Sequence, residues 1–308
     1  MAAADAGAVT MYGQSPPREE TPELLEASFR DLLEEIGKLP EDDTACWRRA
    51  SSARPDLTGE SHRIMFLRCE LFDAVAAARK ICKYWTSRFE LFGERLALLP
   101  LRLGGDGLLN PANSEGHADD AETVRLTLQC MGYCFMRVTG RKDSGGRAVV
   151  FADPSRLESY DKSAEQRAAM VRACWATFHL AIQDDEDVQR LGVVVVACPK
   201  NAKLKHADSK LMKRNGAMIS GVLPVRLGAF HICHPPWFFG KVIYPLIKII
   251  MPARLTKRIN VETGKQEEVL AALDKFGLGK EVVPSALGGD LVLKEGIDYV
   301  DDLRAKGK

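Results

Sequence analysis

The sequence predicts an α/β protein: a mostly parallel sheet with flanking helices, preceded by an all-helical N-terminal module. Short β-branched runs bounded by glycine or proline, at 146–152 and 191–199, are typical of buried strands. A helix-like stretch over 163–183 separates them, as in a crossover between parallel strands. Residues 21 to 104 instead place apolar side chains at helical spacing, with no strand pattern.

The helical module begins with a clear start signal. Thr21 is a good N-cap, and Pro22 suits the first helical position, so a helix is expected to run to about residue 37. Thr58 opens a second helix, and Asp73 can cap a third over about 74–92. We therefore expect a disordered lead over 1–20, a helical module over 21–104, a linker over 105–118, an α/β domain over 119–293 and a tail over 294–308.

The α/β domain continues the alternation of helices and strands. After a helix over about 121–135, the pattern changes to short apolar runs separated by amphipathic stretches. The remaining expected elements are a strand at 226–233, a short edge strand at 257–261, and helices at about 207–222 and 265–275.

Composition limits the function. Lys and Arg total 43 against 42 Asp and Glu, so a strongly basic face for nucleic acid is not expected. Eight scattered cysteines fit free thiols in a reducing compartment, and no secretory signal is visible. The apolar stretch 237–252 would be about 24 Å long as a helix, too short for a hydrocarbon layer of about 30 Å. It could lie on a membrane, and we expect a cytoplasmic protein.

Catalytic and cofactor motifs are not found. The chain has no phosphate-binding glycine loop between a strand and a helix, and no G-x-S-x-G elbow. Cys130 and Cys134 have no partner at metal-ligand spacing. We expect no metal, no cofactor and no enzymatic activity. His179 interrupts an apolar helix face, so it is either a packed core residue with one hydrogen bond or a polar contact to a ligand.

From Ile64 onward the chain resembles the CRAL-TRIO family of lipid-binding proteins, which includes the α-tocopherol and phosphatidylinositol transfer proteins and the retinaldehyde carrier. The resemblance rests on five ordered segments: FLRCELFDAVAAARKICKYWTSR, GRAVVFADPSRL, QDDEDVQRLGVVVVACPKN, LPVRLGAFHICHPPWFFGKVIYPLIKIIMPARLTKRINV and VVPSALGGDL. It implies the CRAL-TRIO fold, with a gate helix lying across the mouth of an apolar pocket.

The resemblance also implies site residues. The lipid pocket would be lined by Trp175, Phe178, His179, Ile182, Val193, Val195, Met218, Ile219, Leu223, Phe230 and Ile232. The gate helix would present Trp237, Phe238, Phe239, Ile243, Leu246, Ile247 and Ile250. A partial headgroup site for phosphoinositides would combine Arg68, Arg226, Lys257 and Arg258.

Departures from the family pattern leave the ligand open. Phosphatidylinositol-binding members carry an acidic residue after the proline that begins this strand, whereas Val225 follows Pro224 here. Tocopherol-type members carry two basic residues on the strand; Arg226 matches one position, but Gly228 stands at the other.

We expect a non-enzymatic carrier that moves one hydrophobic molecule between membranes and touches the membrane surface reversibly. The alternative is a lipid-sensing adaptor that docks a protein partner without transferring cargo.

Overall fold

One sheet organises the second half of the chain. The computed structural model describes residues 12–251 and 253–308, apart from the side chains of Ile250 and Arg254. The strands are β1 (Met136–Lys142), β2 (Ala148–Ala152), β3 (Val193–Ala197), β4 (Leu227–Cys233) and β5 (Ile259–Glu262). They lie in chain order, with β1 antiparallel to β2 and all later neighbours parallel. The predicted mostly parallel sheet is confirmed.

Helices cover both faces of this sheet. They are α5 (Ala118–Gly132), α6 (Ala164–Ile182), α7 (Glu186–Leu191), α8 (Ser209–Gly221), α9 (Tyr244–Ile250), α10 (Ala253–Thr256), α11 (Gln266–Asp274) and α12 (Gly296–Ala305). Short turns of 3-10 helix lie at η2 (Pro111–Ser114), η3 (Pro154–Ser159), η4 (Leu204–His206) and η6 (Ser285–Leu287).

The central strands alternate their side chains between two apolar layers. Val150 and Val195 pack into the core that contains α6 and α8, whereas Val149 and Val194 pack with α11 on the other face. Successive strand side chains point to opposite faces, so a sheet covered on both sides needs apolar residues at every position. This accounts for the unbroken β-branched runs of β2 and β3.

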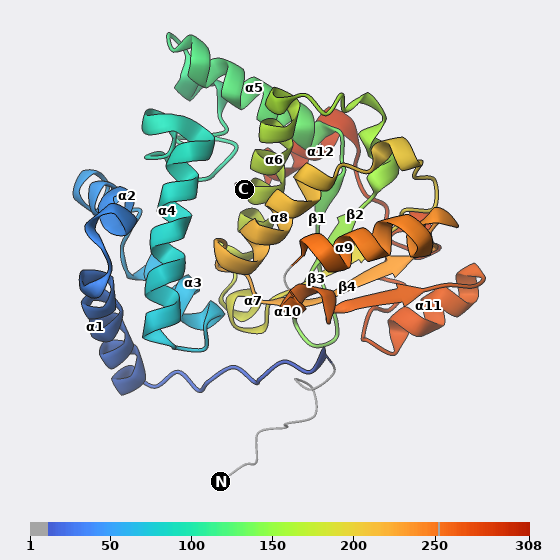
Figure 1. Cartoon of the computed structure of the whole chain (residues 1–308), viewed down its shortest axis with the longest axis horizontal. Coiled ribbons are helices and arrows are strands. Elements are labelled where there is room, and N and C mark those ends of the chain that lie inside the picture. The colour runs from blue at the N-terminus through green and yellow to red at the C-terminus, as the bar shows by residue number, and fades with distance from the viewer. Residues whose placement is uncertain (1–11, 252) are drawn as a thin grey trace.

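The N-terminal module consists of α1 (Pro22–Lys38), α2 (Glu41–Ala53), α3 (Glu60–Cys69) and α4 (Ala74–Leu96), beside the α/β domain in Figure 1. The expected caps are present: the side chains of Thr21 and Asp73 accept hydrogen bonds from the N–H groups of Leu24 and Ala76. The module joins the domain where α4 meets α6, with the rings of Tyr84 and Trp175 4.9 Å apart.

Several elements differ from the expected ones. The helix α2 and the strand β1 were not predicted, because α2 is rich in charge and the outer half of β1 is exposed. An additional helix, α7, follows α6 and is capped by Asp185. The expected linker contains η2, where Asn113 accepts a hydrogen bond from Arg95 at 2.7 Å. The tail forms α12, with Val300 and Leu303 buried.

Residues 12–20, which we call the N-terminal strap, run in Figure 1 along the lower side of the molecule, from below the α/β domain to the start of the first helix of the N-terminal module. We expected disorder over 1–20; residues 1–11 lie outside the described part of the chain, but for 12–20 the expectation is wrong. The Gln14 amide donates to the Leu227 carbonyl at 3.0 Å, and the Tyr12 ring stacks 5.4 Å from that of Phe276. These partners are over 200 residues away in sequence, so local composition cannot reveal them.

Candidate functional site

An apolar cavity of about 240 Å³ lies between the sheet and the helices α8 and α9. Its floor is the carboxyl half of the strands, where Val195, Phe230 and Ile232 point away from α11. The rest of the apolar lining comes mainly from Phe135, Met136, Leu157, Leu211, Met212, Ile219, Phe238, Phe239, Ile243, Ile247 and Met251. Such a lining suits a hydrophobic molecule.

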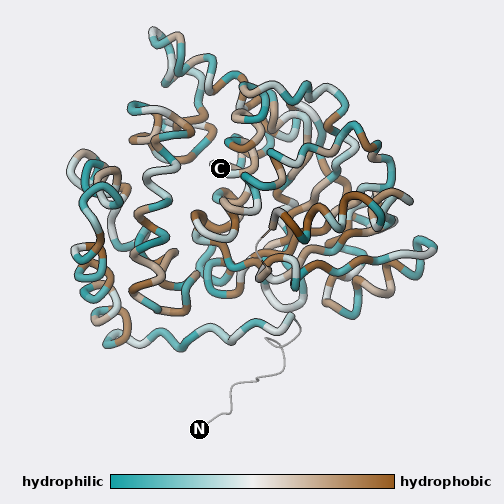
Figure 2. The backbone as a smooth tube through the Cα atoms, in the orientation of Figure 1, coloured by the Kyte–Doolittle hydropathy of each residue, from teal (hydrophilic) through white to brown (hydrophobic). Residues whose placement is uncertain are grey.

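One wall of the cavity is a surface segment, residues 237–251, which we call the covering segment. Phe239 and Ile247 turn inward and are buried. Trp237 and Ile249 are 82% and 81% exposed. Large apolar side chains exposed to this extent mark surfaces that interact with partners or membranes. The covering segment is therefore apolar on both its inner and its outer side, and α9 is correspondingly brown in Figure 2.

The backbone of the covering segment changes character at Pro245. A π-helical turn, η5 (Phe239–Ile243), precedes α9, and the Tyr244 N–H bonds to the Phe239 carbonyl. Pro245 lies in the first turn of α9. A proline is tolerated there because the first N–H groups of a helix have no partner within the helix, whereas a proline inside a continuous helix would break a hydrogen bond. The π-helical turn ends just before α9 begins, so the hydrogen-bond pattern changes in the middle of the covering segment.

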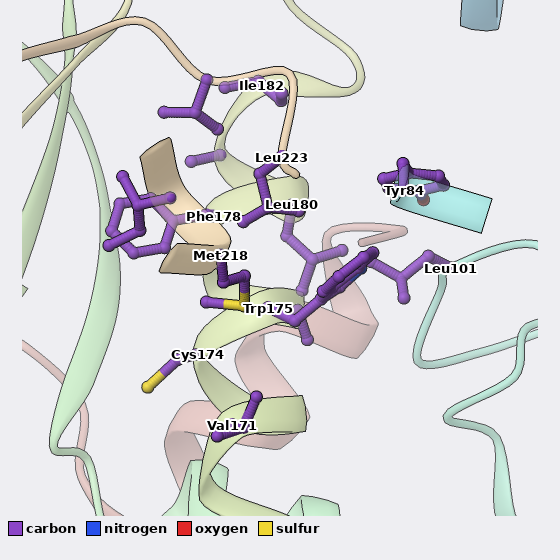
Figure 3. Packing of buried hydrophobic residues seen from close by; sticks show 14 of the residues in the cluster. Tyr84, Leu101, Val171, Cys174, Trp175, Phe178, Leu180, Ile182, Met218 and Leu223 are labelled. Carbon is purple, nitrogen blue, oxygen red and sulfur yellow. The ribbon is translucent and has the colours of Figure 1, made fainter. Parts of the chain in front are cut away.

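The structure places the predicted pocket residues in two groups. Val195, Ile219, Phe230 and Ile232 line the cavity. The other seven do not, so their assignment to the pocket is corrected: Trp175, Phe178, His179, Ile182, Val193, Met218 and Leu223 are buried outside the cavity lining. Trp175, Phe178, Met218 and Leu223 crowd around α6 in Figure 3, with Tyr84 from α4 beside them. At Trp175 and His179, the Tyr84 ring of α4 lies where the resemblance placed a ligand, with ring centres 4.9 and 5.9 Å away.

The predicted gate residues also divide. Phe238, Phe239, Ile243 and Ile247 line the cavity, and Leu246 is half-buried outside the lining. Trp237 faces solvent, and the side chain of Ile250 lies outside the described residues. The two lysines of the segment, Lys241 and Lys248, are both exposed.

On the α8 side of the cavity, sequence reasoning identified Ile219 but missed Leu211, Met212 and Asn215. These three residues recur with Ile219 at helical spacing and line the cavity, a period of three to four that was readable from the sequence. Phe135 and Met136 were missed because β1 was not predicted.

Polar groups at the cavity are few, and most are already bonded. His206 meets Glu158 at 2.7 Å, and the Asp208 carboxylate accepts the Tyr160 hydroxyl at 2.9 Å. The Asn215 amide nitrogen lies 3.4 Å from the Cys174 sulfur, but its oxygen is buried without a hydrogen bond. Burial raises the pKa of the Cys174 thiol to about 12, so this sulfur is uncharged near neutral pH.

His179 occupies the α4–α6 core. Its ring stacks 5.9 Å from that of Tyr84, and its Nδ1 has no hydrogen-bond partner. Burial, assisted by the positive charge of Arg88, lowers the pKa of His179 to about 3. Of the two alternatives, the structure therefore has the packed core residue, but without the expected hydrogen bond.

The predicted headgroup residues lie at the amino ends of the parallel strands, away from the cavity. Arg226 directly precedes β4, and Lys257 and Arg258 directly precede β5. Arg68 lies in the last turn of α3 and is buried beside α7, donating to the Gln189 amide oxygen at 2.6 Å. Lys257 is exposed. None of the four lines the cavity, so the fold gathers these residues at one edge without connecting them to the apolar site.

The described residues contain neither a membrane-spanning helix nor a cluster of metal ligands. No helix in that part of the chain is long and apolar enough to cross a membrane. No group of three or more His, Cys, Asp or Glu side chains there could hold a metal ion.

A sheet, an apolar cavity and a surface segment that forms one of its walls are the features of a binding protein for hydrophobic ligands. The CRAL/TRIO domain matches residues 132–289, slightly more than half of the chain. The protein therefore belongs to the CRAL/TRIO family, whose members are generally lipid-binding and lipid-transfer proteins rather than enzymes.

Among the solved structures that match the chain is one titled "Crystal structure of Sfh5". It has a TM-score of 0.48 and 13% sequence identity, and the match covers 79% of this chain and 82% of that one. No curated protein sequence matches the chain.

Proposed function

We propose that the protein carries one hydrophobic molecule in the apolar cavity and exchanges it with membranes when the covering segment moves aside as a gate. One observation carries this proposal: the segment that forms one wall of the cavity is also the segment that exposes Trp237 and Ile249 to solvent. A single movement can then place the outer side in a membrane interface and open the inner side to a lipid. No covalent chemistry is required.

The energetics require such a cover. Burying apolar surface gains roughly 25 cal/mol per Å², so a ligand that hides a few hundred Å² gains on the order of 10 kcal/mol. A similar amount is lost when the ligand leaves a bilayer, so transfer needs a cavity that matches the membrane as a solvent. The lining described above is apolar enough for this.

The cavity volume sets a condition on entry. A cavity of about 150 Å³ holds a benzene-sized ligand, so the 240 Å³ found here suits a ring system or part of a chain. A whole lipid requires the covering segment to shift outward. The junction at Pro245 is the natural place for that movement, because the hydrogen-bond pattern already changes there.

The outer side of the covering segment suits a membrane surface. Tryptophan and aliphatic side chains enter the interface, while lysines stay at the headgroup level, and Lys241 and Lys248 supply the two positive charges. We propose reversible, peripheral binding. All eight cysteines are free, which fits the reducing cytoplasm as the working compartment.

Recognition of phosphoinositides is the second part of the proposal. Arg68, Arg226 and Arg258 lie at one edge of the sheet, and guanidinium groups bind phosphate through paired hydrogen bonds. Since this edge is remote from the cavity, the phosphoinositide would be a membrane signal rather than the cargo.

Two measurements test the carrier function. Native mass spectrometry of the purified protein, followed by lipid extraction, should reveal a co-purified hydrophobic molecule. In a vesicle-to-vesicle assay, the fluorescent form of that molecule should move at substoichiometric protein. Binding without transfer would favour the adaptor alternative, and absence of any bound or bindable hydrophobic molecule would remove both.

A further inference from the structure

A row of arginines follows the amino edge of the sheet. Arg147, Arg226 and Arg258 each directly precede a strand, namely β2, β4 and β5, and Arg190 lies at the end of α7 shortly before β3. The parallel register sets Ala148 beside Val193 and Val193 beside Leu227, so residues that precede these strands collect at the same edge. With Arg68 from α3, these five side chains form what we call the arginine row.

The N-terminal strap meets this row along its length. At its start, the Arg147 guanidinium lies 5.0 Å from the centre of the Tyr12 ring, and Arg258 donates to the Tyr12 carbonyl at 3.5 Å. In the middle, Arg226 donates to the Ser15 carbonyl at 2.7 Å. The strap therefore offers oxygen acceptors to successive guanidinium groups, with the Gln14 side chain anchored between them on Leu227.

Glu20 ends the strap in the strongest contact. Arg68 donates from Nε to Oε1 at 2.9 Å and from Nη2 to Oε2 at 2.8 Å. Arg190 repeats this pattern at 2.9 and 3.0 Å. One carboxylate thus receives four charge-assisted hydrogen bonds from two planar forks, a geometry that also fits a phosphate group. Burial opposes ionisation, but the bonds from Arg68 and Arg190 prevail and hold the pKa of Glu20 at about 2.

The neighbouring acids define which anion could replace Glu20. Arg68 and Arg190 also meet Glu186, at 3.1 and 2.8 Å, and Arg190 lies 3.4 Å from Asp187. Arg147 pairs with Asp143 at 3.1 Å. An anion that replaces Glu20 has to compete with these carboxylates for the same guanidinium groups. A second negative charge and additional oxygen acceptors would strengthen its bonds to the arginines. A phosphomonoester provides both.

We propose that the strap is a built-in competitor, which occupies the arginine row and has to be displaced before a multiply charged phosphate group can bind there. The proposal rests on the phosphoinositide part of the proposed function and adds its regulation. The phosphate can belong to a lipid headgroup or to a soluble compound, since both present the same oxygens.

Matched variants separate this role of Glu20 from simple charge. Glu20→Gln removes the carboxylate that the two arginines bind, and Glu19→Gln makes the same change in net charge at the adjacent exposed side chain. Gln14→Ala, which loses the bond to the Leu227 carbonyl, is a second way to loosen the strap if Glu20→Gln does not fold. Circular dichroism of the full chain checks folding for each.

Two readouts follow the strap and the site independently. Release of the strap is measured as trypsin cleavage after the exposed Arg18, with each rate divided by that of a free peptide of the same sequence. Anion binding is measured with phosphatidylcholine vesicles with and without phosphatidylinositol bisphosphate, and with soluble inositol trisphosphate. The vesicle and soluble arms distinguish a lipid headgroup from a free phosphate.

We expect Glu20→Gln to bind the phosphoinositide vesicles about tenfold more tightly than the wild type, because one charge-assisted competitor is lost, and to be cleaved faster after Arg18. Glu19→Gln should match the wild type in both readouts. Bound phosphate should accelerate cleavage of the wild type. Equal binding by all three proteins, or cleavage that phosphate does not change, would overturn the proposal.

These results are separable from the carrier function. Cargo transfer with no effect of Glu20→Gln on either readout overturns the competitor and leaves the carrier standing. Displacement of the strap by phosphate, in a protein that binds no cargo, supports the competitor and removes the carrier.

Discussion

Trp237 and Phe239, two positions apart, face opposite sides of the covering segment: Trp237 is 82% exposed, whereas Phe239 is 7% exposed and lines the cavity. The outer side chains of the segment are therefore available to a membrane surface, and the inner ones contact the cavity. Substitutions at the two positions should therefore affect different measurements.

Replacing the outer residue should weaken membrane binding alone. Trp237→Ala removes a large interfacial side chain, and we expect roughly tenfold weaker binding to vesicles, with the melting temperature unchanged because the ring buries little surface in the folded protein. Vesicle sedimentation measures this. Val292→Ala, at an equally exposed position outside the segment (82%), is the control; an equal loss there would show that the covering segment has no special role.

Filling the cavity should abolish ligand binding without unfolding the protein. Ile219 lines the cavity, so Ile219→Trp places the larger side chain in empty space, at a cost below the usual 1–3 kcal/mol of overpacking. Ligand titration should then show at least about a tenfold loss of affinity. Its neighbour Met218 lies outside the lining, and Met218→Leu should bind as the wild type does. Full binding by Ile219→Trp would place the ligand elsewhere.

Trp175 should matter for stability rather than for the ligand. Trp175 lies on α6 and is fully buried against the rings of Tyr84 and Phe92 on α4. Trp175→Ala should therefore lower the free energy of unfolding by about 3–5 kcal/mol. Urea unfolding measures this loss. The identity of the co-purified ligand should not change, and a changed ligand would restore Trp175 to the pocket.

His179 should make the protein less stable in acid. In the unfolded chain this ring has a pKa near 6.5, whereas in the folded protein its pKa is about 3. The stability contributed is therefore complete above about pH 6.5 and is lost as the pH falls from there toward 3. His62 acts in the same direction, because burial lowers its pKa well below the ordinary value.

Unfolding free energies across this pH range test the assignment. His179→Leu should show a weaker pH dependence than the wild type, whereas His117→Gln, at an exposed position, should leave it unchanged. An unaltered slope in His179→Leu would mean that the ring is protonated in the native state.

The sheet was predictable because its signal is local. Runs such as Val193–Ala197 carry their strand character in their own side chains, and parallel order follows from the helices between them. The strand β1 gave no such signal, since only its first residues are buried. The helix α7 was hidden because an N-cap aspartate and an acidic first turn resemble a loop when the acids are adjacent.

The site was less predictable because it depends on packing between distant helices. The side chains of α6 are apolar on nearly every face, a pattern that fits either the wall of a cavity or a filled core. The packing of Tyr84 from α4 against this helix shows that the side facing α4 is a filled core. The arginine row has a different origin. Arg147 and Arg190 were readable as residues near strand starts, but their convergence requires the register of the sheet.

The docking of Tyr12 has a consequence for biosynthesis. Its partners His231 and Phe276 are separated from it by 219 and 264 residues, and a ribosome releases the amino end first. The earliest described residues of the nascent chain therefore find their places only when most of the polypeptide has emerged. The contacts of Tyr12 with the sheet therefore belong to a late stage of folding, after the residues around Phe276 have been synthesised.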